Sequence, residues 1–96
     1  MVTLKWTDFA IEDVNAIHDY IALDSEFYAR KFTDRVIERT EALKMHPNLG
    51  RVVPEFSNEL IRELIEGNYR IIYKVETETV FIIRVHHSTK LLLNLE

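Results

Sequence analysis

Two adjacent histidines, His86 and His87, stand between Arg84 and Lys90 in the stretch RVHHSTK near the end of the chain. Imidazole is the side chain that most readily exchanges a proton near neutral pH, so the stretch is a candidate for acid–base chemistry. Metal binding by the pair is not expected, because neighbouring strand residues point to opposite faces and no cysteine or acidic cluster lies at ligand spacing. The sequence therefore predicts no metal and no cofactor.

Basic residues at alternating positions are the second set with possible chemistry. In YRIIYKVE, residues 69–76, Arg70 and Lys74 alternate with residues of the mostly apolar face. On one sheet face such residues give a positively charged surface. Arg62, in the preceding strand candidate, is a weaker member of this set, since any exposed strand carries such residues.

The same alternation continues in TVFIIRVHH, residues 79–87. It predicts one face with Phe81, Ile83 and Val85, and places Arg84 on the other. If the apolar faces meet the helices, then Arg70, Lys74 and Arg84 all point to an uncovered face. Carried further, the pattern directs the two histidines to opposite faces.

The elements that must position these residues follow from periodicity. VTLKW alternates as a short strand, and Thr7 or Asp8 is placed to cap a helix whose apolar stripe is Ala10, Val14, Ile17 and Ile21. Asp24 or Ser25 caps a second helix with a stripe at Ala29, Phe32, Val36, Thr40 and Leu43, which His46–Pro47 stops. A loop and three strand candidates, LIRELI, YRIIYKVE and TVFIIRVHH, complete the chain. We therefore expect an α+β fold in which a helical hairpin packs on an antiparallel meander.

Composition limits the class of protein. The chain has 96 residues, a net charge of −4 and no cysteine, which predicts one domain over 1–96 with no disulfides. Neither a signal peptide nor an apolar run of membrane-spanning length is present, so a cytoplasmic protein is expected. Charge is uneven: residues 1–27 carry one basic and six acidic residues, whereas residues 28–54 carry six basic and three acidic ones. The net charge of the whole chain therefore conceals a basic middle, and solvated helix faces are its ordinary explanation.

Four motifs in order make the chain similar to a known family. They are P-x-x-G-R (Pro47, Gly50, Arg51), R-E-L (Arg62, Glu63, Leu64), Y-R-I-x-Y (Tyr69, Arg70, Ile71, Tyr73) and V-x-H (Val85, His87). With the helical hairpin before them, they resemble the RelE/ParE superfamily toxins of bacterial type II toxin–antitoxin systems. The match extends over nearly the whole chain, and the long hairpin is more similar to the ParE branch.

The resemblance implies a toxin neutralised by a co-encoded antitoxin. Members either inhibit DNA gyrase or cleave mRNA on the ribosome. In RelE-like nucleases arginine or lysine and then tyrosine follow the histidine, but here Ser88, Thr89 and Lys90 follow His87 and no tyrosine comes after them. This departure favours a ParE-like gyrase inhibitor, a plasmid-stabilisation type of protein that binds its target without turnover.

Three functions remain open at this point. For the gyrase inhibitor, the candidate partner-binding residues are Arg30, Lys31, Arg35, Arg62 and Arg70. For a metal-independent mRNA endoribonuclease on the ribosome, the candidate catalytic residues are Arg70, His87 and Lys90. An inactivated member that only binds antitoxin is the third. A homodimer and a toxin–antitoxin hetero-oligomer are both compatible with the sequence.

Overall fold

The computed structural model describes residues 1–89. Two helices and five strands are present in this part of the chain, and none of its helices is long and apolar enough to cross a membrane. In chain order the elements are β1 (Thr3–Trp6), α1 (Asp8–Ala22), α2 (Glu26–Glu41), the 3₁₀ turn η1 (Ala42–Lys44), β2 (Arg51–Val52), β3 (Ile61–Glu66), β4 (Tyr69–Val75) and β5 (Thr79–His87).

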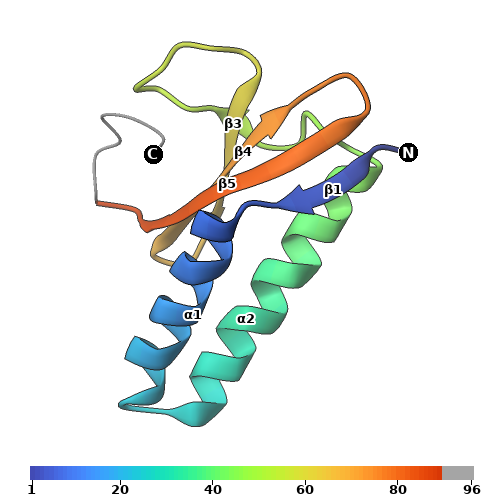
Figure 1. Ribbon diagram of the computed structural model, residues 1–96. Helices are drawn as coiled ribbons and strands as arrows, with labels where there is room; N and C mark the ends of the chain where they lie inside the picture. The colour runs from blue at the N-terminus through green and yellow to red at the C-terminus, as the bar shows by residue number, and fades with distance from the viewer. Residues whose placement is uncertain (90–96) are drawn as a thin grey trace.

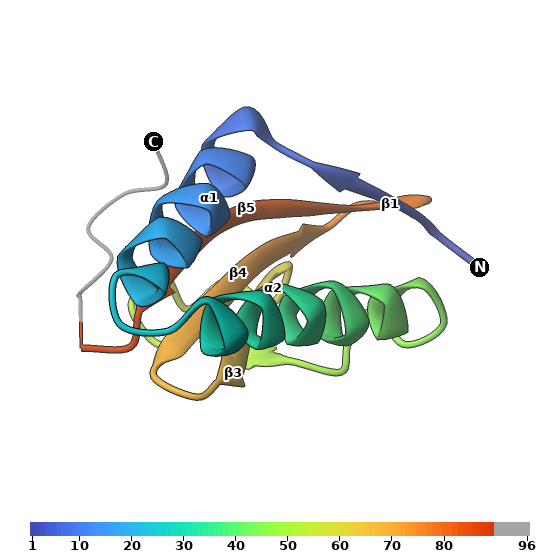
Figure 2. The same ribbon diagram turned by 90° about the horizontal axis from the view of Figure 1, so that it is seen from below.

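Both helices begin at hydroxyl caps. The Thr7 Oγ1 accepts a hydrogen bond from the Ala10 N–H at 3.1 Å, and the Ser25 Oγ accepts one from the Tyr28 N–H at 3.2 Å. Each cap satisfies one of the backbone donors that the first helical turn leaves without a partner. The predicted helical hairpin is thereby confirmed, with α1 nearer β5 and α2 nearer β3 in Figures 1 and 2.

The sheet has the strand order β1-β5-β4-β3-β2 (Figure 1). Strands β3, β4 and β5 form the predicted antiparallel meander, and the α+β fold is as expected. Two features were not predicted. The first strand pairs in parallel with the last, Thr3 opposite Thr79, and the two-residue β2 adds an antiparallel edge beside β3.

The main core lies between the helices and one sheet face. Ala10 and Val36 of the helices meet sheet residues that are almost fully buried: Leu64, Ile71, Tyr73, Val80, Ile82 and Val85. The predicted grouping of Phe81 and Ile83 with Val85 is wrong. The register shifts between Ile72, opposite Arg84, and Tyr73, opposite Ile82, so one extra residue of β5 reverses the alternation before it.

The sequence had predicted that the second sheet face is open to solvent. In the structure this face is covered. The segment after β2 folds across it, and Val53 and Phe56 pack with Ile61 and Ile72 in a small second core. Arg70, expected on an open face, is only 5% exposed. The β2–β3 connection therefore closes over the face that was expected to present cations.

Arg84 also departs from the expected open face. Its guanidinium bonds the Asp13 carboxylate of α1 at 2.8 and 3.1 Å, and the Asp13 Oδ2 accepts the Val85 N–H at 2.9 Å. Because β1 ends at Trp6, α1 takes its place beside the C-terminal half of β5. The Asp13 hydrogen bond raises the pKa of Arg84 above its ordinary value. Arg84 and Asp13 thus join helix α1 to strand β5.

Candidate functional site

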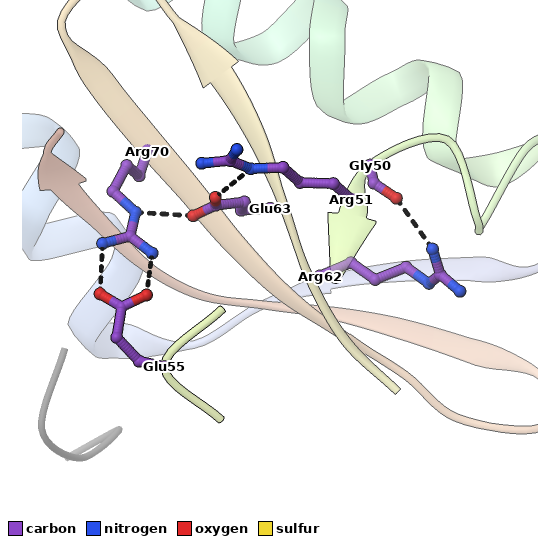
Figure 3. Close-up of polar contacts among 6 residues, drawn as sticks. All are labelled: Gly50, Arg51, Glu55, Arg62, Glu63 and Arg70. Atoms are coloured by element: carbon purple, nitrogen blue, oxygen red, sulfur yellow. Dashed lines mark hydrogen bonds and ion pairs between the residues drawn. The ribbon is translucent and has the colours of Figure 1, made fainter. Parts of the chain in front are cut away.

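Arg70 lies at the start of β4 and is held by two carboxylates (Figure 3). Its Nε donates to the Glu63 Oε1 at 2.6 Å, and its two terminal nitrogens each donate to one oxygen of Glu55 at 2.8 Å. The hydrogen bonds that Arg70 donates to Glu55, and then the one that it donates to Glu63, raise the pKa of Arg70 above its usual value, although burial opposes this. The guanidinium is therefore permanently charged and tightly paired.

Glu63 is the centre of this arrangement. Its side chain is 0% exposed, and its second oxygen accepts from the Arg51 Nε at 2.6 Å. Arg51 itself is 64% exposed, whereas Arg70 is 6% exposed at the side chain. Glu63 thus joins one solvent-facing and one buried arginine. We call Arg51, Glu55, Glu63 and Arg70 the charge cluster; its formal charges sum to zero.

An open hollow of about 360 Å³ lies beside the charge cluster. It is lined by Arg51, Pro54, Glu55, Ile65, Arg70 and Ser88. Three of the four cluster residues therefore border a space into which a small group from another molecule fits.

The two histidines point to opposite sides of the sheet, as predicted. His86 lies opposite Arg70 in the β4–β5 register and is buried, whereas His87 lies opposite Tyr69 and is exposed. The His87 ring packs edge-on against the Tyr69 ring, with centroids 5.5 Å apart, and its Nδ1 is 2.8 Å from the Thr89 Oγ1. Tyr69 in turn packs on the helix-side core, so His87 is on the helix side.

The predicted catalytic set is consequently not assembled in the described residues. Arg70 and His87 occupy adjacent register positions, and their side chains leave the sheet on opposite faces. Lys90 and the apolar run after it lie outside the described residues. Among residues 1–89, no group of three or more histidine, cysteine or acidic side chains is placed to hold a metal ion.

The candidate partner residues of α2 are on the surface. Arg30 and Lys31 border a hollow of about 220 Å³ together with Phe27 and Asp34, and the Lys31 Nζ lies 5.9 Å from the Phe27 ring centroid. Arg35 is half-exposed and bonds Glu66 of β3 at 3.0 Å. Two of the three helix cations thus remain directed outward.

Arg62 has a local role. Its Nη1 donates to the Gly50 carbonyl at 2.9 Å (Figure 3), and its Nε donates to the Glu59 carbonyl at 3.1 Å. These bonds fasten the residue before β2 and the end of the β2–β3 connection to β3. Since Arg62 lies opposite Tyr73, whereas Arg70 lies opposite Ile65, the two arginines start from different faces of the sheet.

Sequence reasoning did not identify Glu55 or Asp13 as members of these ion pairs. A signal existed for Glu63, because a carboxylate between apolar strand positions needs a cation if it is buried. Nothing local indicates Glu55, which reaches Arg70 only because the loop folds back over the sheet. Asp13 likewise depends on where α1 lies.

Comparison with known proteins places this geometry in a family. The family model described as "ParE toxin of type II toxin-antitoxin system, parDE" matches residues 4–92. Toxin RelE2 of Caulobacter vibrioides is 31% identical over 91 residues, which span 95% of this chain and the whole of that protein.

Two solved structures show the same architecture. The chromosomal ParDE toxin–antitoxin system from P. aeruginosa contains a chain that is 28% identical, with a TM-score of 0.74, and the match covers 91% of this chain and 96% of that one. The RelBE2 toxin–antitoxin complex from Mycobacterium tuberculosis contains a chain at 22% identity with a TM-score of 0.63, covering 90% and 96%. At 22% identity, the likeness to the RelBE2 chain shows a shared fold.

Proposed function

Because this chain belongs to the RelE/ParE superfamily of type II toxin–antitoxin toxins, we propose that it is a ParE-like inhibitor of DNA gyrase. A co-encoded antitoxin neutralises it by binding. The proposal assigns the chain to the cytoplasm, the compartment in which gyrase acts on the chromosome. It requires recognition of a target and no chemical turnover.

The observation that carries the proposal is the separation of Arg70 from His87. Cleavage of RNA through the ribose 2′-hydroxyl needs a base, an acid and a cation that converge on one phosphate. Here Arg70 is enclosed by Glu55 and Glu63, while His87 faces the helix side against Tyr69. A surface that separates and neutralises these groups suits binding better than catalysis.

The helical hairpin supports a recognition role. Helices of 15 and 16 residues carry large apolar side chains on the outside near the turn between them: Tyr20 is 70% exposed, Leu23 83%, Phe27 68% and Tyr28 62%. Arg30 and Lys31 follow on α2. Exposed aromatic residues beside cations are the composition found at protein-binding hot spots. We assign target contact to this end of the hairpin.

An antitoxin partner is supported by the related structures, which are toxin–antitoxin complexes. Amphipathic segments bind such folds by filling a groove or by adding a strand to a sheet edge. The short β2 strand is one edge of the sheet described here. Its two residues leave backbone groups for an added strand to pair with.

The experiment combines two assays on one antitoxin-free sample. We expect loss of DNA supercoiling by gyrase and intact mRNA on programmed ribosomes. Lys31→Glu should weaken the gyrase effect about tenfold or more, as the loss of an interface cation does. Lys5→Glu, an equal charge change at an exposed site on β1, is the matched control and should act like the wild type.

The other functions give distinct outcomes. Cleaved mRNA with normal supercoiling, abolished by Arg70→Ala or His87→Ala in a folded protein, would overturn the proposal in favour of the ribosome-dependent nuclease. If neither assay responds while antitoxin still binds, the chain is an inactive member of the family. If Lys31→Glu and Lys5→Glu inhibit gyrase equally well, the assignment of target contact to the α2 surface is refuted, and the rest of the proposal stands.

A further inference from the structure

We propose that the hollow on the outer side of α2 is a docking site for a protein segment in which a carboxylate lies beside an apolar side chain. This hollow of about 220 Å³ is lined by Phe27, Arg30, Lys31 and Asp34, and we call it the α2 hollow. The inference rests on the proposed function and deepens it, because it names the chemistry that the target presents to the helical hairpin.

The spacing of the four lining residues puts them on one side of the helix. They follow one another at intervals of three, one and three positions, so they cover two successive turns of the same side. Ala29 and Val36 of the same helix are fully buried on the core side. All four lining residues are exposed. The α2 hollow therefore opens to solvent, where a partner can reach it.

The apolar part of the site is the Phe27 ring and its surroundings. Phe27 is 68% exposed and packs edge-on against Tyr28, with ring centroids 5.2 Å apart, and the exposed Leu23 precedes them. The Lys31 Nζ lies 5.9 Å from the Phe27 ring centroid, within the range of a cation–π contact. An apolar surface and an ammonium group thus border the same space. Covering the ring with an apolar side chain of a partner is favourable.

The cations of the α2 hollow differ from their neighbours on the same helix. Arg35 and Arg39 both bond Glu66 of β3. Within residues 1–89, Arg30 and Lys31 form no ion pair with a carboxylate. A carboxylate that enters the α2 hollow therefore gains cationic partners without breaking an existing ion pair. These two residues are better placed for a partner than the paired arginines.

The charge of the lining selects the kind of anion. Arg30 and Lys31 against Asp34 leave one positive charge in excess, whereas the whole chain has a net charge of −4. One carboxylate balances the local excess, but a polyanion such as RNA is repelled by the rest of the chain. Asp34 disfavours a second anion at its end of the hollow. A single acidic side chain beside an apolar one is the occupant that matches both the ring and the charge.

The test is an NMR titration of the isotope-labelled, antitoxin-free protein with three small probes. Phenylacetate carries a ring and a carboxylate, acetate lacks the ring, and benzylammonium carries the ring with the opposite charge. We expect phenylacetate to shift the backbone amide signals of α2 from Phe27 to Asp34. It should bind about fivefold or more tightly than either other probe, because only phenylacetate uses both parts of the site.

Variants separate the two parts. Phe27→Ala should abolish the preference for phenylacetate over acetate, and Arg30→Gln/Lys31→Gln should abolish its preference over benzylammonium. Asp34→Asn should strengthen phenylacetate binding about two- to threefold, because it removes a like charge at an exposed site. The matched control is Glu78→Gln, which removes the same charge from an exposed position of the β4–β5 turn and should leave the affinity unchanged.

Three results would overturn the inference. They are the absence of a phenylacetate response in α2, equal binding of benzylammonium, and tighter binding of dimethyl phosphate than of phenylacetate. The last result would assign the α2 hollow to a nucleic-acid phosphodiester. The probes need no gyrase, so the two proposals fail separately. Normal supercoiling with the expected probe binding would refute the proposed function alone, whereas inhibited gyrase without probe binding would refute this inference alone.

Discussion

The charge cluster allows one comparison in which distance is constant and burial differs. Glu63 accepts from Arg51 and from Arg70 at the same 2.6 Å, but the Arg51 side chain is 64% exposed and that of Arg70 is 6% exposed. Two unit charges 4 Å apart interact by about 1 kcal/mol in water and by about 4 kcal/mol at an effective dielectric constant near 20. The coupling of Glu63 to Arg70 should therefore exceed its coupling to Arg51 several-fold.

The perturbation is Glu63→Gln, alone and combined with Arg70→Met or Arg51→Met. Removal of one partner of a buried ion pair costs about 3–5 kcal/mol. We expect Glu63→Gln to lie near the lower end of this range, because the glutamine amide oxygen still accepts a hydrogen bond and Arg70 remains bonded to Glu55. We expect a coupling free energy of about 2 kcal/mol or more with Arg70 and below about 1 kcal/mol with Arg51.

Urea unfolding followed by circular dichroism measures all of these free energies, provided that the slope against denaturant is the same for each variant. The Arg51→Met single variant is the control, because it removes a cation of the same cluster from the solvent side. A Glu63–Arg51 coupling equal to or larger than the Glu63–Arg70 coupling would show that burial does not set the strength of these pairs, and the reasoning would fail.

Three further predictions test the contacts around the cluster and the helix–sheet join. Gly50→Ala should lower the free energy of unfolding by about 1–3 kcal/mol in urea, because a Cβ there clashes with a backbone carbonyl of β3 and lies 2.8 Å from the Tyr73 hydroxyl; an unchanged midpoint would contradict the close approach. Tyr73→Phe should cost about 1–3 kcal/mol at pH 7, since the Gly50 N–H that donates to this hydroxyl at 2.8 Å is left unpaired. Burial raises the pKa of Tyr73 in the folded protein. The contribution of the neutral Tyr73 to stability is therefore complete below the unfolded pKa of about 10, and it is lost as pH rises through the folded pKa. Above a pH of about 10, the free energy of unfolding should fall less steeply with pH in Tyr73→Phe than in the wild type. Asp13→Ala removes the acceptor of both Arg84 and the Val85 N–H and should cost about 1–3 kcal/mol, with faster hydrogen exchange at Val85, whereas unaltered exchange there would exclude the proposed edge contact.

Local patterns were sufficient for both helices, for four of the five described strands and for the meander. The caps at Thr7 and Ser25 are short-range hydrogen bonds, and three alternating segments separated by turn residues define consecutive antiparallel strands. Those predictions depended on residues a few positions apart. They were confirmed because no distant contact opposes them.

What sequence reasoning missed depends on contacts between distant residues. The bulge near Ile83 reversed the face of part of β5, because one extra residue shifts a period of two and leaves no mark in composition. Arg70 and His87 were grouped as one catalytic set because the family resemblance implied it, although the alternation of the two strands already directed them to opposite faces. The Glu55 contact with Arg70, 15 residues apart, required knowledge of how the loop closes.

The parallel pairing of β1 with β5 has a consequence for the order of folding. The Thr7 hydroxyl bonds the Ile83 carbonyl across 76 positions of sequence. During synthesis at about 5–20 residues per second, the first strand waits roughly 4–15 s for its partner. The helical hairpin, built from local contacts, forms sooner and exposes its apolar stripe throughout that interval. A chain that ends before β5 therefore has both helices but lacks the strand that joins β1 to the rest of the sheet.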